Sequence, residues 1–336
     1  DKKISRVVQH IYCHLPYLTI KKHIYLIGYE NFGNLGDHQI RLSEIEFIKK
    51  IYPNTSIITI PVSKYYEYKK WLKRKIGKKD LILLNGGGNL GDYYPMAENV
   101  RRDVISEWKD NKIVIFPQTI FFSKTEDGYK SRKGTTNIYN THKNLTLSLR
   151  ENVSYIDAKK DFKCNLILCP DIVLFSRYKK RRQLENKILL CLRNDVEQKL
   201  SLDDLIIINN LANKYYNNSV YYDDLQYFYS MSDNESIANL NSFFEMLSTF
   251  DLVITDRLHG MIFCAISGIK CIVLGNYNHK IKGVYQWITD LEYIKYIDKI
   301  ELLEKTLIDI KSAKINIELL DNLSFDPLEV SLKEKL

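Results

Sequence analysis

The chain has 336 residues and a formal net charge of +8, with 45% hydrophobic and 27% charged residues. One core rarely serves a chain of this length, so two domains are expected, and the composition is that of an ordinary folded globular protein. The excess of positive charge favours anionic partners, which include phosphorylated small molecules, membrane surfaces and nucleic acids.

The basic residues are densest at positions 69–79 and 177–182. Neither run interleaves with aromatic residues in a recognised nucleic-acid-binding motif, so both are interpreted as solvated faces and no nucleic-acid partner is predicted. The six cysteines form no C-x-x-C pair. Most of them lie inside apolar patterns, which predicts a reducing cytoplasm without disulfides or a zinc site.

No apolar run approaches the ~20 residues that span a bilayer. Residues 4–20 are basic and apolar with a proline near their end, which fits either an interfacial helix or a packed first helix. We therefore predict a cytoplasmic protein, with peripheral contact at the inner face of the membrane as one of two interpretations of this segment.

After residue 20, short apolar runs alternate with longer segments of helical spacing, such as residues 38–51 and 96–108. This alternation predicts βαβ units around a parallel sheet. The apolar runs of this first half lie at residues 23–28, 56–60, 81–84, 112–116, 145–149 and 166–168.

Residues 176–186 are polar and basic and interrupt the pattern, which makes them the best candidate for a domain linker. The predicted domains are therefore residues 1–178 and 179–336, two Rossmann-like halves with a cleft between them. The second half is expected to contain strands at 187–192, 220–222, 252–255 and 271–274, helices at 202–215, 240–247 and 258–266, and C-terminal helices from about residue 300. Ligands of open parallel sheets bind at the carboxyl ends of the strands, so the loops there are the candidates for function.

The first such loop, GYENFGNLGDH at residues 28–38, follows a strand and opens a helix. Its three glycines allow the backbone to approach a ligand, and the start of the helix offers free N–H groups to an anion. The spacing matches neither a dinucleotide fingerprint nor a Walker loop. Asp37 has the alternative role of a plain helix N-cap.

The second loop, NGGGNLGD at residues 85–92, follows another apolar strand and repeats the pentapeptide GNLGD of residues 33–37. Four glycines in six positions weaken any regular structure unless the backbone must approach something closely. We therefore favour a functional role for this loop over a simple turn.

The third loop, TDRLHG at residues 255–260, joins an apolar strand to a helix that runs to Gly268. Asp256 is expected to cap the helix, Arg257 can fork onto a carboxylate or phosphate, and His259 can transfer protons near neutral pH. A capped helix with a surface arginine and a packed histidine is the alternative. The combination of Arg, His and Asp at one strand end favours chemistry.

Two further arginines end apolar strands. Arg150 lies in LSLRE and points toward the same edge, and Arg193 ends the first strand of the second half, where pairing with Asp195 or Glu197 is an alternative role. Strand-end turns are predicted at residues 117–118 and 170–171, and Asp171 is placed to orient a basic partner.

Taken together, these segments resemble the polysaccharide pyruvyl transferase family. The most specific elements are GGGN and TDRLHG, whereas residues 1–20 and the last part of the chain carry no such signal. The motifs that match are GYENFGNLGD at 28–37, LNGGGNLGD at 84–92, FPQT at 116–119, LSLRE at 147–151, CPD at 169–171 and TDRLHG at 255–260.

The resemblance implies a GT-B-like fold with two Rossmann-like domains facing a cleft. It also implies transfer of pyruvate from phosphoenolpyruvate to two hydroxyls of a sugar, which gives a cyclic ketal and free phosphate. Matched by motif, Arg257 and His259 are donor-binding and catalytic residues, Arg150 binds the same donor, and Leu258 contributes its backbone.

In that chemistry His259 is the best-placed acid to protonate the methylene carbon of phosphoenolpyruvate. Asp37, His38 and Asp92 are alternative bases for the hydroxyl protons, and the remaining residues expected near the acceptor are Asn34, Gly87, Asn89 and Arg193. We expect no metal and no cofactor besides phosphoenolpyruvate as co-substrate, because arginines meet the charge of the donor.

Two rival functions remain at this level. One is a GT-B glycosyltransferase that uses a nucleotide sugar, for which an acidic residue that grips the ribose is expected. The other is a non-catalytic carbohydrate-binding protein, against which the intact Arg257 and His259 argue. The acceptor is expected to be a bacterial surface polysaccharide, either capsule or exopolysaccharide, or its lipid-linked precursor. The sugar, the hydroxyl pair and the oligomeric state cannot be inferred from the sequence.

Overall fold

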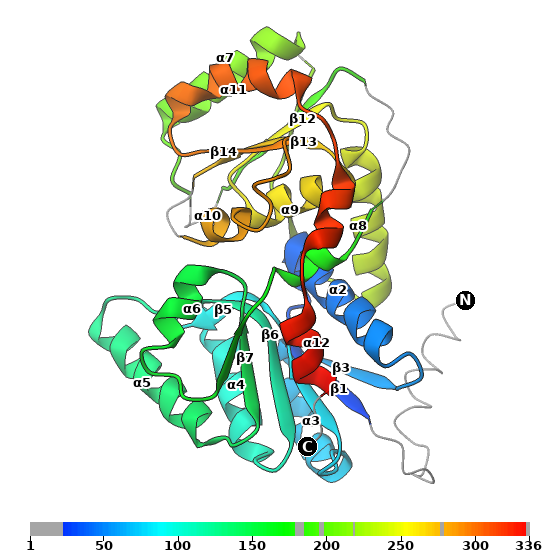
Figure 1. Ribbon diagram of the computed structural model, residues 1–336, viewed down its shortest axis with the longest axis vertical. Coiled ribbons are helices and arrows are strands. Elements are labelled where there is room, and N and C mark those ends of the chain that lie inside the picture. Colours follow the sequence, from blue (N-terminus) through cyan, green and yellow to red (C-terminus); the bar gives the residue numbers. More distant parts are fainter. Residues whose placement is uncertain (1–22, 179–184, 195–197, 218, 276–278, 334–336) are drawn as a thin grey trace.

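The computed structural model describes residues 23–178, 185–194, 198–217, 219–275 and 279–333, and it has two α/β units stacked along the long axis (Figure 1). The predicted residues 4–20 and the proposed partners Asp195 and Glu197 lie outside the described residues. Among the helices that are described, none is long and apolar enough to cross a bilayer.

The first unit is built on a parallel sheet of strand order β3-β1-β4-β6-β7-β8, with β5 paired to β6. Its strands are β1 (Ile24–Tyr29), β3 (Ile57–Pro61), β4 (Leu81–Leu84), β5 (Gly87–Gly91), β6 (Lys112–Phe121), β7 (Leu145–Leu149) and β8 (Asn165–Leu168). Its helices are α2 (Leu35–Ile51), α3 (Tyr65–Lys75), α4 (Pro95–Glu107), α5 (Glu126–Thr141) and α6 (Asn152–Ala158), with 3-10 turns at Val62–Lys64 and Ile172–Phe175.

The second unit has a parallel sheet of order β10-β9-β12-β13-β14. The strands are β9 (Ile188–Cys191), β10 (Val220–Asp223), β12 (Leu252–Thr255), β13 (Lys270–Leu274) and β14 (Ile294–Ile297). The helices are α7 (Leu202–Tyr216), α8 (Asp233–Leu247), α9 (Leu258–Ser267), α10 (Lys280–Tyr285), α11 (Leu303–Asp309) and α12 (Asp326–Lys333), with 3-10 turns at Ile300–Leu302, Ile310–Ser312 and Ile317–Asn322.

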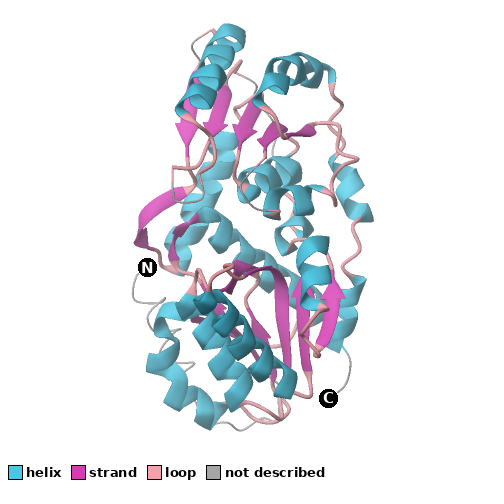
Figure 2. Ribbon diagram, turned by 90° about the vertical axis from the view of Figure 1, so that its left-hand side faces the viewer, coloured by secondary structure: helices cyan, strands magenta, loops and turns pink. Residues whose placement is uncertain are grey.

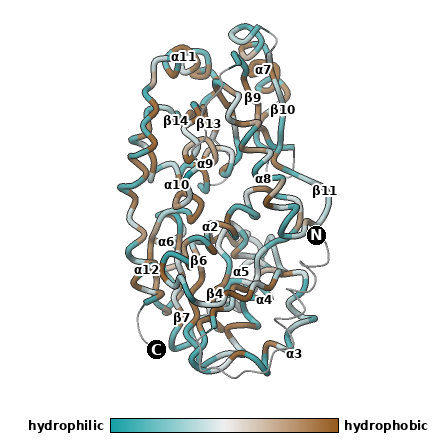
Figure 3. Tube along the Cα trace, turned by 90° about the vertical axis from the view of Figure 1, so that its right-hand side faces the viewer, coloured by the Kyte–Doolittle hydropathy of each residue, from teal (hydrophilic) through white to brown (hydrophobic). Residues whose placement is uncertain are grey.

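The central strands are apolar along their whole length because helices cover both faces of each sheet (Figure 2). In β4 and β12, for example, every residue is buried. Figure 3 shows the hydrophobic residues gathered on the strands of both sheets and hydrophilic positions along the outer helices. The predicted fold class, two Rossmann-like domains of GT-B type, is therefore confirmed in its α/β architecture.

The two units are joined by contacts outside the two large sheets, of which three are examples. Strand β11 (Gln226–Ser230) pairs antiparallel with β2 (Phe32–Asn34), so closely that a Cβ on Gly33 would lie 1.4 Å from the carbonyl oxygen of Tyr227. The buried Arg41 of α2 pairs with Asp233 of α8. The C-terminal helix α12 returns to the first unit, where the Tyr52 hydroxyl donates to the Leu332 carbonyl at 2.7 Å.

Two sequence predictions about loops were wrong in their local structure. The turn predicted at residues 117–118 is part of the ten-residue strand β6, whose pairing with β7 shifts register between Ile115 and Gln118. The glycine loop at 85–92 contains strand β5, because a bulged backbone with glycines at positive φ can still pair with β6. The domain boundary at residue 178 stays a prediction.

Candidate active site

The two sheets each reverse their strand order once, and both reversals lie where the predicted loops begin. In the first sheet the order changes beside β1, between β3 and β4, and the two glycine loops follow β1 and β4. In the second sheet the order changes beside β9, which lies between β10 and β12. Residues 192–193 follow β9, and residues 256–257 follow β12. Such switch points are where open parallel sheets bind ligands.

The two switch points meet directly at Gly36 and His259. A Cβ built on Gly36 would lie 2.1 Å from Nδ1 of the His259 ring, so only glycine leaves room for the imidazole at the start of α2. His259 lies in the first turn of α9, which begins at Leu258. The starts of two helices from different units are therefore packed against each other.

The strand end that carries Arg257 is fixed by a chain of backbone contacts. The Thr255 hydroxyl donates to the Cys191 carbonyl at 2.6 Å and accepts from the backbone N–H of Arg257 at 3.0 Å. Asp256 was predicted to cap α9, and that prediction was wrong. Its carboxylate instead accepts from the backbone N–H of Arg193 at 2.7 Å, and Arg257 occupies the N-cap position without a side-chain cap bond.

His259 lies in a cationic environment. Its pKa is lowered to about 4, mainly by burial; Asp171 acts in the opposite direction, and the positive charges of Arg150, Arg193 and Arg257 contribute to the lowering. The Nε2 atom is buried and has no hydrogen-bond partner among the described residues. In the absence of an anion the imidazole is therefore neutral at pH 7.

Arg150 comes from the first unit and is 2% exposed. Its Nε donates to the Thr119 hydroxyl at 2.8 Å, and its Nη1 pairs with Asp171 at 2.7 Å, which confirms that Asp171 orients a basic partner. Trp287 donates from Nε1 to the Arg150 carbonyl at 2.8 Å. These contacts hold the guanidinium rigidly before any ligand arrives.

The second glycine loop lies against this arginine. A Cβ on Gly88 would be 2.8 Å from Arg150 Nη2 and 3.7 Å from Lys280 Nζ, so a side chain there would press on the cations. Gly87 has a φ of +120°, a conformation that L side chains rarely adopt. The glycines of this loop thus let the backbone lie close to Arg150 and Lys280.

Asp37 is the acidic member of the site. Its pKa is raised to about 7, mainly by burial and then by the negative charge of Glu30, while Arg150 and Lys280 act in the opposite direction. The alternative role of Asp37 as N-cap does not hold, because Asn34 caps α2 by accepting from the backbone N–H of Gly36 at 2.8 Å. Asp37 is left partly exposed, and its raised pKa makes its charge state sensitive to pH near neutrality.

Other predicted residues have structural partners. Asn89 accepts hydrogen bonds from Arg101 and, at 3.2 Å, from Gln118. Asp92 accepts from the backbone N–H and the hydroxyl of Ser123. His38 is buried in α2 near Arg41 and Asp233, and burial lowers its pKa to about 4.

Sequence reasoning did not single out Lys280 or Glu30. No sequence motif marks Lys280, and it comes close to Gly88 only because the two units pack against each other. Glu30 stands inside the first glycine loop, directly after β1, so its position at a strand end was a usable signal. Burial raises the Glu30 pKa, while Arg101 and a hydrogen bond to Asn89 lower it.

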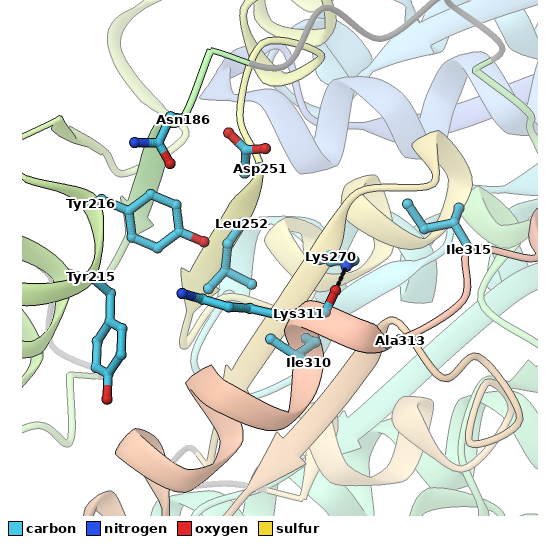
Figure 4. A pocket seen from close by; sticks show the side chains of 10 residues that line it. All are labelled: Asn186, Tyr215, Tyr216, Asp251, Leu252, Lys270, Ile310, Lys311, Ala313 and Ile315. Atoms are coloured by element: carbon cyan, nitrogen blue, oxygen red, sulfur yellow. Dashed lines mark hydrogen bonds between the residues drawn. The ribbon is translucent and has the colours of Figure 1, made fainter.

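A pocket of about 440 Å³ lies at the opposite end of the second sheet (Figure 4). It is bounded by the starts of β12 and β13, by Tyr215 and Tyr216 of α7, and by Lys311. None of the residues predicted for the active site lines it. Because parallel strands present ligand-binding loops at their carboxyl ends, we place the site at the Gly36–His259 contact instead.

Comparison with known proteins agrees with these motifs. The pattern of the polysaccharide pyruvyl transferase family matches residues 34–279. General stress protein 30 of Bacillus subtilis is 34% identical over 306 residues, which cover 89% of this chain and 88% of that protein. Pyruvyl transferase 1 of Schizosaccharomyces pombe is 27% identical over 76% of this chain and 66% of its own length.

Among solved structures, a functionally uncharacterized protein from Klebsiella pneumoniae has a similar fold, with a TM-score of 0.56 at 17% sequence identity. The alignment covers 88% of this chain and 98% of that one, so the likeness extends over both units. With the family pattern spanning both switch points and a relative matching nearly nine-tenths of the sequence, the chain belongs to the polysaccharide pyruvyl transferase family.

Proposed function

We propose that this protein transfers the pyruvyl group of phosphoenolpyruvate to two hydroxyls of one sugar in a bacterial surface polysaccharide or its lipid-linked precursor. Family membership supports pyruvyl transfer to a polysaccharide. The donor, the ketal product and the lipid linkage are our inference. The observation that carries it is the convergence on His259 of Arg150 from one unit with Arg193 and Arg257 from the other.

The donor carries a carboxylate and a phosphate on adjacent atoms, and a small dianion of this kind suits several arginines around a narrow space. Lys280 adds a fourth positive charge next to Arg150. Donor binding would bring negative charge to His259, and this opposes the burial and the positive charges that hold its pKa low. In this proposal the donor itself converts the neutral imidazole into the acid that the reaction requires.

The reaction then proceeds in balanced steps. His259 gives a proton to the methylene carbon, which becomes a methyl group, and C2 becomes an oxocarbenium-like electrophile. One sugar hydroxyl bonds to C2 and loses its proton to a base. Phosphate leaves with its electron pair, the second hydroxyl closes the ketal, and its proton leaves with the phosphate. One hydroxyl proton therefore replaces the one that His259 supplied.

Asp37 is the base we favour among the three predicted alternatives. Asp37 is partly exposed and lies near Arg150 and Lys280, whereas Asp92 is bound to Ser123 and His38 is buried toward Arg41. With a pKa of about 7, Asp37 can accept a proton at neutral pH. Glu30 lies close enough to raise that pKa and extends the acidic side of the site.

The test is to mix the protein with phosphoenolpyruvate and a panel of soluble saccharides, and to measure phosphate release and a saccharide mass gain equal to pyruvate minus water. Arg257→Ala and His259→Ala are expected to reduce kcat by about 10²-fold or more, because each removes a group that acts on the developing charge or proton. Arg74→Ala, which removes an exposed arginine of α3, is the matched control and is expected to retain full turnover.

Full turnover in Arg257→Ala and His259→Ala would show that the site assignment is wrong. Consumption of UDP-sugars without consumption of phosphoenolpyruvate would instead support the glycosyltransferase alternative.

A further inference from the structure

One short segment of the first unit is strongly basic. Residues 64–79 contain eight Lys or Arg residues and one Glu, a balance of +7 in a chain whose formal net charge is +8. Most of this segment is helix α3 (Tyr65–Lys75), which lies on the outside of the first unit (Figure 1). The sequence alone favoured a solvated face here, and the structure adds two observations that change this interpretation.

The first observation concerns which charges are neutralised. Three of the cations, Lys70, Arg74 and Lys79, are exposed, and no carboxylate of the described residues lies within ion-pairing distance of them. Four other cations of this segment form ion pairs: Lys64 with Glu67 at 2.8 Å, Lys69 with Asp103 at 2.7 Å, Lys73 with Glu107 at 2.8 Å and Lys78 with Asp110 at 2.8 Å. An excess of positive charge therefore remains on the outer face.

The second observation is that an aromatic ring shares this face. Tyr66 is 57% exposed, although Tyr65 and Leu72 of the same helix are buried against the sheet. Tyr66, Lys70 and Arg74 follow one another at i, i+4 and i+8, so they form a single line along the helix. A merely solvated helix accounts for the cations and not for the exposed ring of Tyr66.

We propose that α3 is a membrane-docking surface that binds an anionic lipid bilayer, with the helix axis in the plane of the interface. Lysine and arginine side chains are attracted to anionic headgroups, and tyrosine rings are amphipathic and favour the headgroup level. The convex outer face of a helix fits a plane, whereas single-stranded nucleic acids require a groove with stacking positions.

The docking surface is continuous with the active-site edge. Because β3 is parallel to β1 and β4, the 3-10 turn before α3 begins at the carboxyl edge of the sheet. There the side chains of Ser63 and Asn31 are hydrogen-bonded at 3.0 Å, and Asn31 follows Glu30 of the first glycine loop. A chain docked through α3 thus has this edge near the bilayer, where a lipid-linked acceptor would be presented.

The experiment is co-sedimentation of the full chain with vesicles of phosphatidylcholine containing about 30% phosphatidylglycerol, with pure phosphatidylcholine vesicles and a DNA duplex as comparisons. The wild type is expected to bind the anionic vesicles and to lose binding as salt is raised. Lys70→Gln with Arg74→Gln is expected to weaken this binding about tenfold or more, given the attraction per basic residue. Tyr66→Ser is expected to weaken it with little change in the salt dependence.

The matched control is Lys299→Gln with Lys305→Gln, two exposed lysines of the second unit, which is expected to bind vesicles like the wild type. Equal binding by the Lys70/Arg74 variant and the wild type would overturn the proposal, as would wild-type binding that ignores lipid charge or that favours the DNA duplex. Phosphate release with a soluble acceptor is expected to be unchanged in all variants, so this proposal and the proposed function fail independently.

Discussion

The pentapeptide GNLGD occurs twice in this chain, at residues 33–37 and 88–92, and the two copies have different structures. In the first copy the chain leaves β2 and enters α2, so Gly36 faces His259 and Asp37 lies in the first turn of the helix, near Arg150 and Lys280. In the second copy Gly88 to Gly91 are part of strand β5, and Asp92 bonds to Ser123.

The difference teaches that the glycines and the aspartates of this motif have separate roles. Both copies bring a glycine against a cationic or titrating group, Gly36 against His259 and Gly88 against Arg150. Only one copy brings its aspartate there as well. The helix that begins within the first copy turns Asp37 inward, whereas pairing of β5 with β6 carries Asp92 past the site to the end of the strand.

The largest expected difference between the two copies is catalytic. Asp37→Asn is expected to lower kcat by roughly 10²–10⁴-fold, because a general base typically contributes that much. In the wild type, activity should fall as the pH decreases through about 7, where Asp37 becomes protonated. A pH profile of phosphate release checks both statements. Unchanged turnover in Asp37→Asn would remove Asp37 as the base.

Gly36 and Gly91, the second glycines of the two copies, should also respond differently to an added methyl group. Gly36→Ala places a Cβ 2.1 Å from His259 Nδ1, so the ring must move and kcat should fall on the order of 10²-fold. Gly91→Ala places a Cβ 1.6 Å from the Phe121 carbonyl at a φ of +152°, so it should impair folding instead. Steady-state kinetics and thermal unfolding of both variants separate the two effects. A fully active Gly36→Ala would contradict the contact with His259.

Asp37→Asn should also change stability in a pH-dependent way. The folded-state pKa is raised to about 7 from the ordinary value of 3.8, so ionisation of Asp37 disfavours the folded state. Its protonated form contributes stability fully below about pH 4, and this contribution is lost as the pH rises to about 7. Urea unfolding should therefore show Asp37→Asn equal to the wild type at about pH 4 and more stable at about pH 8, by a few kcal/mol. Equal stability at both pH values would show that the pKa is not raised.

The smallest expected effect belongs to the second aspartate. Asp92→Asn weakens the two hydrogen bonds to Ser123, one of them from the backbone N–H at 2.9 Å, and should lower the free energy of unfolding by about 1 kcal/mol. Its kcat should stay within about twofold of the wild type, because no described contact joins Asp92 to the arginines. A thermal melt and steady-state kinetics of phosphate release measure these two effects. A large loss of kcat would make Asp92 a candidate for the catalytic base again.

The periodicity of the sequence determined the alternating strands and helices, and therefore the α/β class, because a buried parallel strand must be apolar along its length. The motifs also determined the family, since GGGN and TDRLHG stand at strand ends where parallel sheets place their ligand-binding loops. Arg150, Arg257 and His259 could be selected on these grounds from the order of residues along the chain.

The tertiary structure alone decided which side chains meet. Nothing local distinguishes Asp37 from Asp92, since both end the same five residues, and their difference arises because one copy opens a helix and the other pairs as a strand. The approach of Lys280 to Gly88 and the contact of Gly36 with His259 join segments that are about 200 residues apart. Such contacts depend on the packing of two units against each other, and a local sequence pattern carries no information about that packing.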